Sequence, residues 1–198
     1  MKLVATPLSH FGRKIRILLA ELEVPFEWVR PAGVLAASPA HYGDNPLMRV
    51  PTLIDGDVTL IESDHIARYL VGKYDAGDRF GVRSSTVDDL NTLAVMNGIM
   101  GNEVVVLLAK RAGLADVDRV VYFQKLLAAI DEGLAWLEVR VAQGALSYRD
   151  IVLVSMWQHV EHYGLIANLD RFPRIAARVG EFAARPSIAT TAPAAQKS

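Results

Sequence analysis

Two serines stand where helices are expected to begin, Ser9 and Ser63. A helix N-terminus offers free backbone N–H groups and the positive end of the helix dipole, and it therefore favours an anion. A serine there is also a common N-cap, which contributes about 1 kcal/mol to stability. Spacing alone favours the N-cap interpretation for Ser9. Glu62 directly precedes Ser63, where a carboxylate has little structural purpose, so we predict binding roles for this pair.

The other residue types that carry chemistry are sparse. The sequence has no cysteine, which excludes disulfides, thiolate metal sites and a cysteine nucleophile. His159 and His162 are three residues apart with Glu161 between them, but the sequence offers no further ligand for them. A hydrogen-bonded or solvated pair is the expected state of these histidines. We therefore expect no metal.

The stretch 45–64 positions the Glu62–Ser63 pair. Pro51 cannot donate a hydrogen bond to a sheet, so it is expected at the start of a strand, and X-Pro bonds alone have ready access to the cis form. Asp55-Gly56-Asp57 lies between two apolar runs and predicts the turn of a β-hairpin. Helical periodicity follows Ser63. The stretch therefore predicts a proline corner, a hairpin and a helix.

The residues before this stretch predict a strand at 2–6, a helix at 9–23 and a strand at 26–30. One face of the helix is apolar, and the opposite face carries Arg13, Lys14 and Arg16. A strand, helix and strand within 30 residues form a βαβ unit with parallel strands and a right-handed connection. An α+β domain is therefore expected at residues 1–76.

The remainder of the chain predicts helices. The expected helices cover 87–112, 117–142, 148–163 and a segment from Pro173 to about Arg185. Ser147 and Asp150 form a capping-box pattern at the start of the third, which is apolar almost all round and therefore belongs in the centre of a core. The tail from Thr190 is expected to be frayed. We expect a linker at 77–86 and an all-α domain at 87–198.

Composition limits the partners. The 198 residues are 52% hydrophobic and 22% charged, as in ordinary globular proteins, and the net charge is −1. Nucleic acid or an anionic membrane would favour a basic excess, so neither is expected as a partner. No run approaches the roughly 20 apolar residues of a membrane span, and no secretory signal is apparent. We expect a soluble cytoplasmic protein.

The succession Asn45-Pro46, Val50-Pro51, hairpin and Glu62-Ser63 resembles that of the small, serine-type bacterial cytosolic glutathione S-transferases. The helical second half, with its Ser147–Asp150 box, also resembles that family. The resemblance covers nearly the whole chain. It implies a thioredoxin-like N-terminal domain (βαβ-α-ββα) followed by an all-α C-terminal domain.

The resemblance also implies a role for each candidate residue. Ser9 would donate a hydrogen bond to the glutathione sulfur, and a drop of two pKa units in that thiol needs about 2.7 kcal/mol. A cis bond before Pro51 would expose the backbone of Val50 to the cysteinyl part of glutathione. The ends of the tripeptide would be bound by three side chains: Arg49 at the glycyl carboxylate, Ser63 at the γ-glutamyl carboxylate and Glu62 at the ammonium group.

The second substrate is expected between the domains, in an apolar pocket. The candidates for this pocket are His10, Asn97, Met100 and Trp157. His10 stands where related bacterial members usually have proline. We expect it to be solvated, although it could instead line the pocket or perturb the thiolate.

The resemblance thus implies an enzyme that activates glutathione as a thiolate for attack on a small hydrophobic electrophile, and a homodimer. Two alternatives stay open. One is a glutathione-dependent peroxidase or isomerase. The other is a non-catalytic binding module of the same fold.

Overall fold

The computed structural model describes residues 1–196. Its strands are β1 (Lys2–Val4), β2 (Glu27–Val29), β3 (Thr52–Asp55) and β4 (Val58–Ile61). Its α-helices are α1 (His10–Glu21), α2 (Ser63–Tyr74), α3 (Val87–Arg111), α4 (Val121–Glu138), α5 (Tyr148–Tyr163), α6 (Pro173–Phe182) and α7 (Pro186–Ala189). Short 3-10 helices cover Pro39–Tyr42, Val117–Arg119, Leu169–Arg171 and Pro193–Ala195.

The strands form one sheet in the order β2-β1-β3-β4. β1 and β2 are parallel, as a βαβ unit requires, and β3 pairs antiparallel with both β1 and β4. The register places Val4 opposite Thr52, and Thr52 opposite Ile61. The end of β1, the start of β3 and the end of β4 therefore lie at the same end of the sheet. This arrangement, followed by helices only, confirms the predicted fold class.

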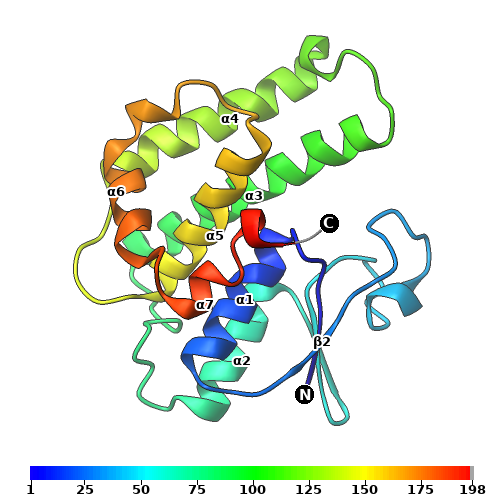
Figure 1. The fold of residues 1–198 in the computed structure, drawn as a ribbon, viewed down its shortest axis with the longest axis vertical. Helices are drawn as coiled ribbons and strands as arrows, with labels where there is room; N and C mark the ends of the chain where they lie inside the picture. Colours follow the sequence, from blue (N-terminus) through cyan, green and yellow to red (C-terminus); the bar gives the residue numbers. More distant parts are fainter. Residues whose placement is uncertain (197–198) are drawn as a thin grey trace.

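The helices of the second half are organised around α5, which is buried along nearly its whole length. The predicted capping box starts it: Ser147 Oγ accepts from the N–H of Asp150 at 3.3 Å, and Asp150 Oδ2 accepts from the N–H of Ser147 at 2.9 Å. In Figure 1, α1 lies between the sheet and the helices of the second half. A single apolar cluster runs from Leu3 in β1 to Ile188 in α7.

The predicted helix at 117–142 is wrong at both ends. A 3-10 helix at Val117–Arg119 precedes α4, which ends at Glu138, well before Gly144. Val120 lies between the two in an extended conformation, with φ −82° and ψ 123°, which interrupts the helical path.

The prediction of a frayed tail from Thr190 is also wrong for residues 190–196, and residues 197–198 lie outside the described residues. Thr191 and Pro193 are buried, and Thr191 Oγ1 accepts a hydrogen bond from Arg13 Nε at 3.2 Å. The buried guanidinium of Arg13 needs acceptors, and carbonyl oxygens of Val154 and Ile188 supply two more. The tail is therefore held against α1.

No apolar run of membrane-spanning length was expected, yet α3 is long and apolar enough to cross a membrane by length and composition. The core helix of a soluble protein passes the same test. α3 packs against α4 and α5, and its polar residues Asn97 and Glu103 bond to side chains of other helices. These contacts make α3 a member of the helical bundle.

Gly12 brings α1 close to β1. A Cβ atom added at residue 12 would lie 2.7 Å from the Cβ of Ala5, closer than two such atoms can approach. We expect Gly12→Ala to lower the free energy of unfolding by roughly 1–3 kcal/mol, because helix and strand must move apart. The control is Gly180→Ala in α6, where nothing lies within 4 Å; it should be stabilising by about 0.5–1 kcal/mol. Urea unfolding measures both, and equal effects would contradict this account.

Candidate functional site

Ser9 is the N-cap of α1, as its spacing predicted. Its Oγ accepts a hydrogen bond from the N–H of Gly12 at 3.0 Å, and the side chain is only partly buried. No acceptor in the described chain takes the hydroxyl proton of Ser9. The hydroxyl can therefore still donate to a ligand group that lies beyond the N-terminus of the helix.

The Val50–Pro51 bond is cis, in agreement with the prediction for this corner. Pro51 is buried directly before β3. Neither the N–H nor the C=O of Val50 hydrogen-bonds to any group within residues 1–196. Both groups are thus available to an extended peptide-like ligand. The side chain of Arg49 is exposed, while its C=O accepts from Asn45 Nδ2 at 2.9 Å.

Glu62, not Ser63 as expected, holds the cap position of α2. Its backbone has φ 72° and ψ 121°, an unusual conformation for a residue with a side chain. Glu62 Oε1 accepts from the N–H of Ser63 at 2.8 Å and from its hydroxyl at 3.1 Å. Ser63 itself is fully buried. Such strain often accompanies functional sites, and the carboxylate of Glu62 here occupies the anion position at the helix start.

The sheet register brings these segments together. Val4, Thr52 and Ile61 are aligned across β1, β3 and β4. The loop that leads to Ser9 leaves β1 at this end of the sheet. Val50–Pro51 enters β3, and Glu62–Ser63 leaves β4, at the same end. Three segments far apart in the sequence therefore border one surface.

A buried polar network behind this surface was not predicted. Lys14 Nζ, fully buried, donates to Asp64 Oδ1 at 2.7 Å and to Asn97 Oδ1 at 2.9 Å. Asn97 Nδ2 and the hydroxyl of Tyr148 donate to Asp64 as well, both at 2.6 Å. Burial alone would raise the pKa of Asp64, but Lys14 and the hydrogen bonds from Tyr148 and Asn97 together outweigh it, and the pKa lies below the usual value. Asn97 thus has both ends of its amide engaged and links α1, α2 and α3.

His10 is buried, with 2% of its surface exposed, so the expectation that it is solvated is wrong. Its Nε2 lies 2.9 Å from the carbonyl oxygen of Met100. Its ring stacks on that of His159, with centroids 4.0 Å apart and planes at 27°. The physical reason is that the first turn of α1 faces α3 and α5 and not water. Burial, and secondarily His159, lower the pKa of His10 well below its usual value.

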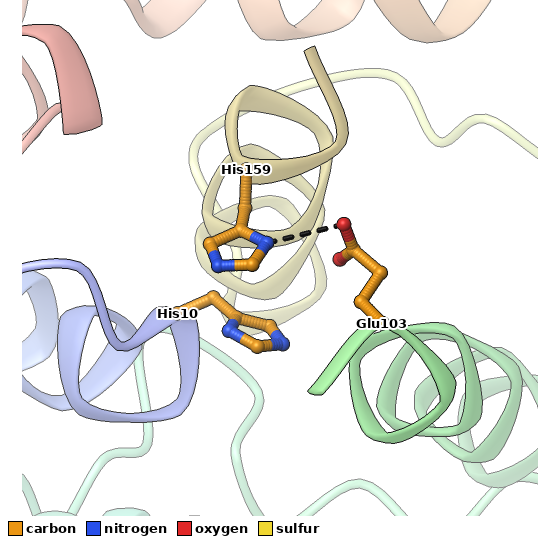
Figure 2. Close-up of side chains that lie close together, drawn as sticks. All are labelled: His10, Glu103 and His159. Carbon is orange, nitrogen blue, oxygen red and sulfur yellow. Dashed lines mark hydrogen bonds and ion pairs between the residues drawn. The ribbon is translucent and has the colours of Figure 1, made fainter. Parts of the chain in front are cut away.

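Figure 2 shows the third member of this cluster, Glu103 on α3. His159 Nδ1 lies 3.1 Å from Glu103 Oε1, while Glu103 Oε2 is buried with no hydrogen-bond partner among the described residues. Burial raises the pKa of Glu103, and His159 only partly offsets that effect. His162, by contrast, is exposed and does not join the cluster. Sequence spacing could not reveal that His10 and Glu103, rather than His162, are the neighbours of His159.

The cluster has the residue types of a metal site, and its potential ligand atoms all lie within 4.8 Å of one another. The lone pair of an imidazole nitrogen lies in the ring plane. The stacked rings of His10 and His159 therefore direct their lone pairs along nearly parallel planes, not toward one point. The geometry fits a hydrogen-bonded cluster and does not form a coordination shell.

The remaining candidates of the second-substrate pocket are part of the core. Met100 is fully buried, and its carbonyl oxygen faces His10. Trp157 is buried with its ring edge-on to Phe172, at 6.3 Å between centroids and 89°. His10, Asn97 and Met100 thus line the contact of α1 with α3, whereas Trp157 packs against the segment that leads into α6.

The low pKa of His10 should make stability depend on pH. Because the folded state binds fewer protons than the unfolded chain, His10 contributes stability above its ordinary pKa of 6.5 that is lost as the pH falls below it. The non-titrating variant His10→Gln should lack this loss. We expect the unfolding free energy of the unsubstituted protein, relative to that of His10→Gln, to decrease by about 1 kcal/mol as the pH falls from about 7.5 to about 5.5. Parallel pH profiles in urea unfolding would contradict the assignment, and the exposed His162→Gln is the control.

Known proteins resemble this chain in the sequence of its first part and in the fold of the whole chain. Residues 3–78 match the family described as "Glutathione S-transferase, N-terminal domain". A probable maleylacetoacetate isomerase of Vibrio cholerae is 26% identical over an alignment of 165 residues, and the match covers 75% of this chain and 73% of that protein.

Two bacterial glutathione S-transferase structures superpose on the chain with a TM-score of 0.81 each. That of Methylobacterium radiotolerans, in complex with glutathione sulfonate, is 24% identical and aligns over 100% of this chain and 96% of its own. That of Methylobacillus flagellatus, with glutathione bound, is 22% identical and aligns over 97% and 98%. Residues 3–78 therefore match the glutathione S-transferase N-terminal domain, and the chain as a whole has the fold of these glutathione transferase structures.

Proposed function

We propose that this protein is a glutathione-dependent enzyme that binds the tripeptide at the sheet end bordered by Ser9, Val50 and Ser63. The observation that carries the proposal is the register of β1, β3 and β4, which brings these three segments to one surface. Further support comes from the two solved relatives, which hold glutathione or glutathione sulfonate.

In this proposal the middle of glutathione pairs with the backbone of Val50, whose N–H and C=O are unused by the described chain. The γ-glutamyl carboxylate takes the start of α2, and Ser63 donates to it. Glu62 then gives up its own hydrogen bonds to Ser63 and turns its carboxylate to the ammonium group of the ligand. The exposed Arg49 reaches the glycyl carboxylate.

The sulfur is proposed to lie at the N-terminus of α1. Ser9 Oγ is held by the N–H of Gly12, so its proton can be donated to a thiolate without breaking that bond. A charge-assisted hydrogen bond and the positive end of α1 both favour the thiolate over the thiol. Together they can supply the approximately 2.7 kcal/mol that lowers a thiol pKa by two units.

Two reactions are compatible with such a thiolate. A transferase would use it to attack a small hydrophobic electrophile and would consume glutathione. An isomerase would add the thiolate to its substrate and expel it again, so that glutathione is returned. The similarity to a probable maleylacetoacetate isomerase favours the isomerase as the second candidate. The concentration of unconjugated glutathione, measured during turnover, separates the two reactions: it falls for a transferase and stays constant for an isomerase.

We further propose a homodimer that uses α2 and α3, since Tyr74, Val87, Leu90 and Val105 on these helices are exposed apolar side chains. We also propose that the chain is divided into an N-terminal domain at 1–76, a linker at 77–86 and a C-terminal domain at 87–198. Sedimentation equilibrium tests the dimer. A monomer at micromolar concentration would exclude it.

Ser9→Ala separates thiol activation from tripeptide binding. We expect glutathione affinity to stay within about threefold, while the pKa of the bound thiol rises and turnover falls at least about tenfold. Ser9→Thr keeps a hydroxyl and should retain most of the activity. Titration calorimetry measures affinity, and the ultraviolet absorbance of the thiolate as a function of pH measures the pKa. Unchanged turnover in Ser9→Ala would remove Ser9 from the mechanism.

Glu62→Gln tests recognition of the ammonium group. The amide keeps an oxygen to cap α2 but loses the charge, so the Kd for glutathione should rise about tenfold with little change in stability. Glu132→Gln on α4 makes the same charge change at an exposed position and should leave the Kd unaltered. Equal affinities of the two variants would refute the role of Glu62. No glutathione binding by the unsubstituted protein would refute the proposed function itself.

A further inference from the structure

A second, cationic pocket lies between α1, β2 and the C-terminal segment. Its volume is about 340 Å³, and its lining residues are Arg16, Trp28, Arg30, Thr190, Ala195 and Gln196. Arg16 and Arg30 come from different elements, yet both stack on the indole ring of Trp28. Their Cζ atoms lie 3.8 Å and 4.1 Å from its centroid. Both guanidinium groups therefore lie against the same indole ring.

The positive charge of this pocket has no counter-charge in the described residues. Arg16 is buried, with 8% exposed, and its one hydrogen bond goes to the neutral Gln196 Oε1 at 3.2 Å. Arg30 forms no ion pair or hydrogen bond within residues 1–196. A buried charge without a partner is costly, and here a second cation stands close by. Accordingly, burial first and Arg30 second lower the pKa of Arg16 to about 10.

The charged groups of the pocket are all hydrogen-bond donors. Each guanidinium carries five N–H donors and no acceptor. Gln196 Oε1 is taken by Arg16, Gln196 Nε2 donates to the carbonyl oxygen of Thr190, and the hydroxyl of Thr190 donates to that of Pro186. Most N–H groups of Arg16 and Arg30 have no acceptor among the described residues, and they match the oxygens of carboxylates and phosphates.

We propose that this pocket binds a small molecule with two oxyanion groups, a dicarboxylate or a diphosphate, and that these groups engage Arg16 and Arg30. The pocket is separate from the candidate glutathione site. β2 lies on the side of β1 away from β3 and β4, and Arg16 is two helical turns from Ser9. The proposal does not rest on the proposed function.

Titration calorimetry of the full chain with pyrophosphate and with succinate tests this site, at constant ionic strength and both with and without glutathione. We expect saturable binding of one molecule of at least one probe per chain, unaffected by glutathione. Arg30→Ala should weaken that binding at least about tenfold, because one of the two guanidiniums is lost. Arg16→Lys keeps the charge of the buried residue but loses the paired N–H donors of the guanidinium, so it should also weaken binding.

Arg174→Ala is the matched control, since Arg174 is likewise exposed and lies on α6, outside the pocket. It should bind the probes as the unsubstituted protein does. The preferred probe identifies the class of oxyanion. The proposal is overturned if neither probe binds saturably, or if Arg30→Ala binds as tightly as Arg174→Ala. Glutathione affinity is measured in the same variants, so a failure of the proposed function is distinguished from a failure of this site.

Discussion

Two cationic side chains of α1, those of Arg13 and Lys14, are buried where the two halves of the chain meet. A buried cation needs oxygen acceptors in fixed positions, because leaving it unpaired costs several kcal/mol. Arg13 finds its acceptors on α5 and the C-terminal segment, including Gln158 Oε1 at 2.5 Å. Lys14 finds one on α2 and one on α3. These bonds set the position and rotation of α1, and hence the direction in which its first turn points.

The geometry of the candidate site depends on this interface. Ser9 caps the helix that Arg13 and Lys14 anchor, and Gly12 lets that helix approach β1. His10, on the same turn, is held between α3 and α5. The hydroxyl proposed to activate a thiol therefore stands on a helix fixed from three sides. Such preorganisation lowers the cost of aligning a donor with a developing negative charge.

Features that depend on residues close together in the sequence were predictable. The proline corner, the hairpin and the Ser147–Asp150 box follow from turn and cap chemistry, and the structure confirms all three. The burial of His10 and the order of the tail after Thr190 were not predictable, because both depend on contacts between distant segments. Two signals were available. α5 is apolar almost all round at its start, so it needs covering neighbours on every side. The charged face of α1 also lacks acidic residues one turn away, which indicates that its partners lie elsewhere.

The Lys14–Asp64 bond joins two elements of the first half, but Asn97 and Tyr148 complete it from the second. Arg13 depends on the second half entirely. Without that half, residues 1–76 would expose Arg13 and Lys14 to water, together with the apolar side chains of α1 that α5 covers. An exchange of one half for that of a distant homologue must therefore supply matching acceptors for both cations.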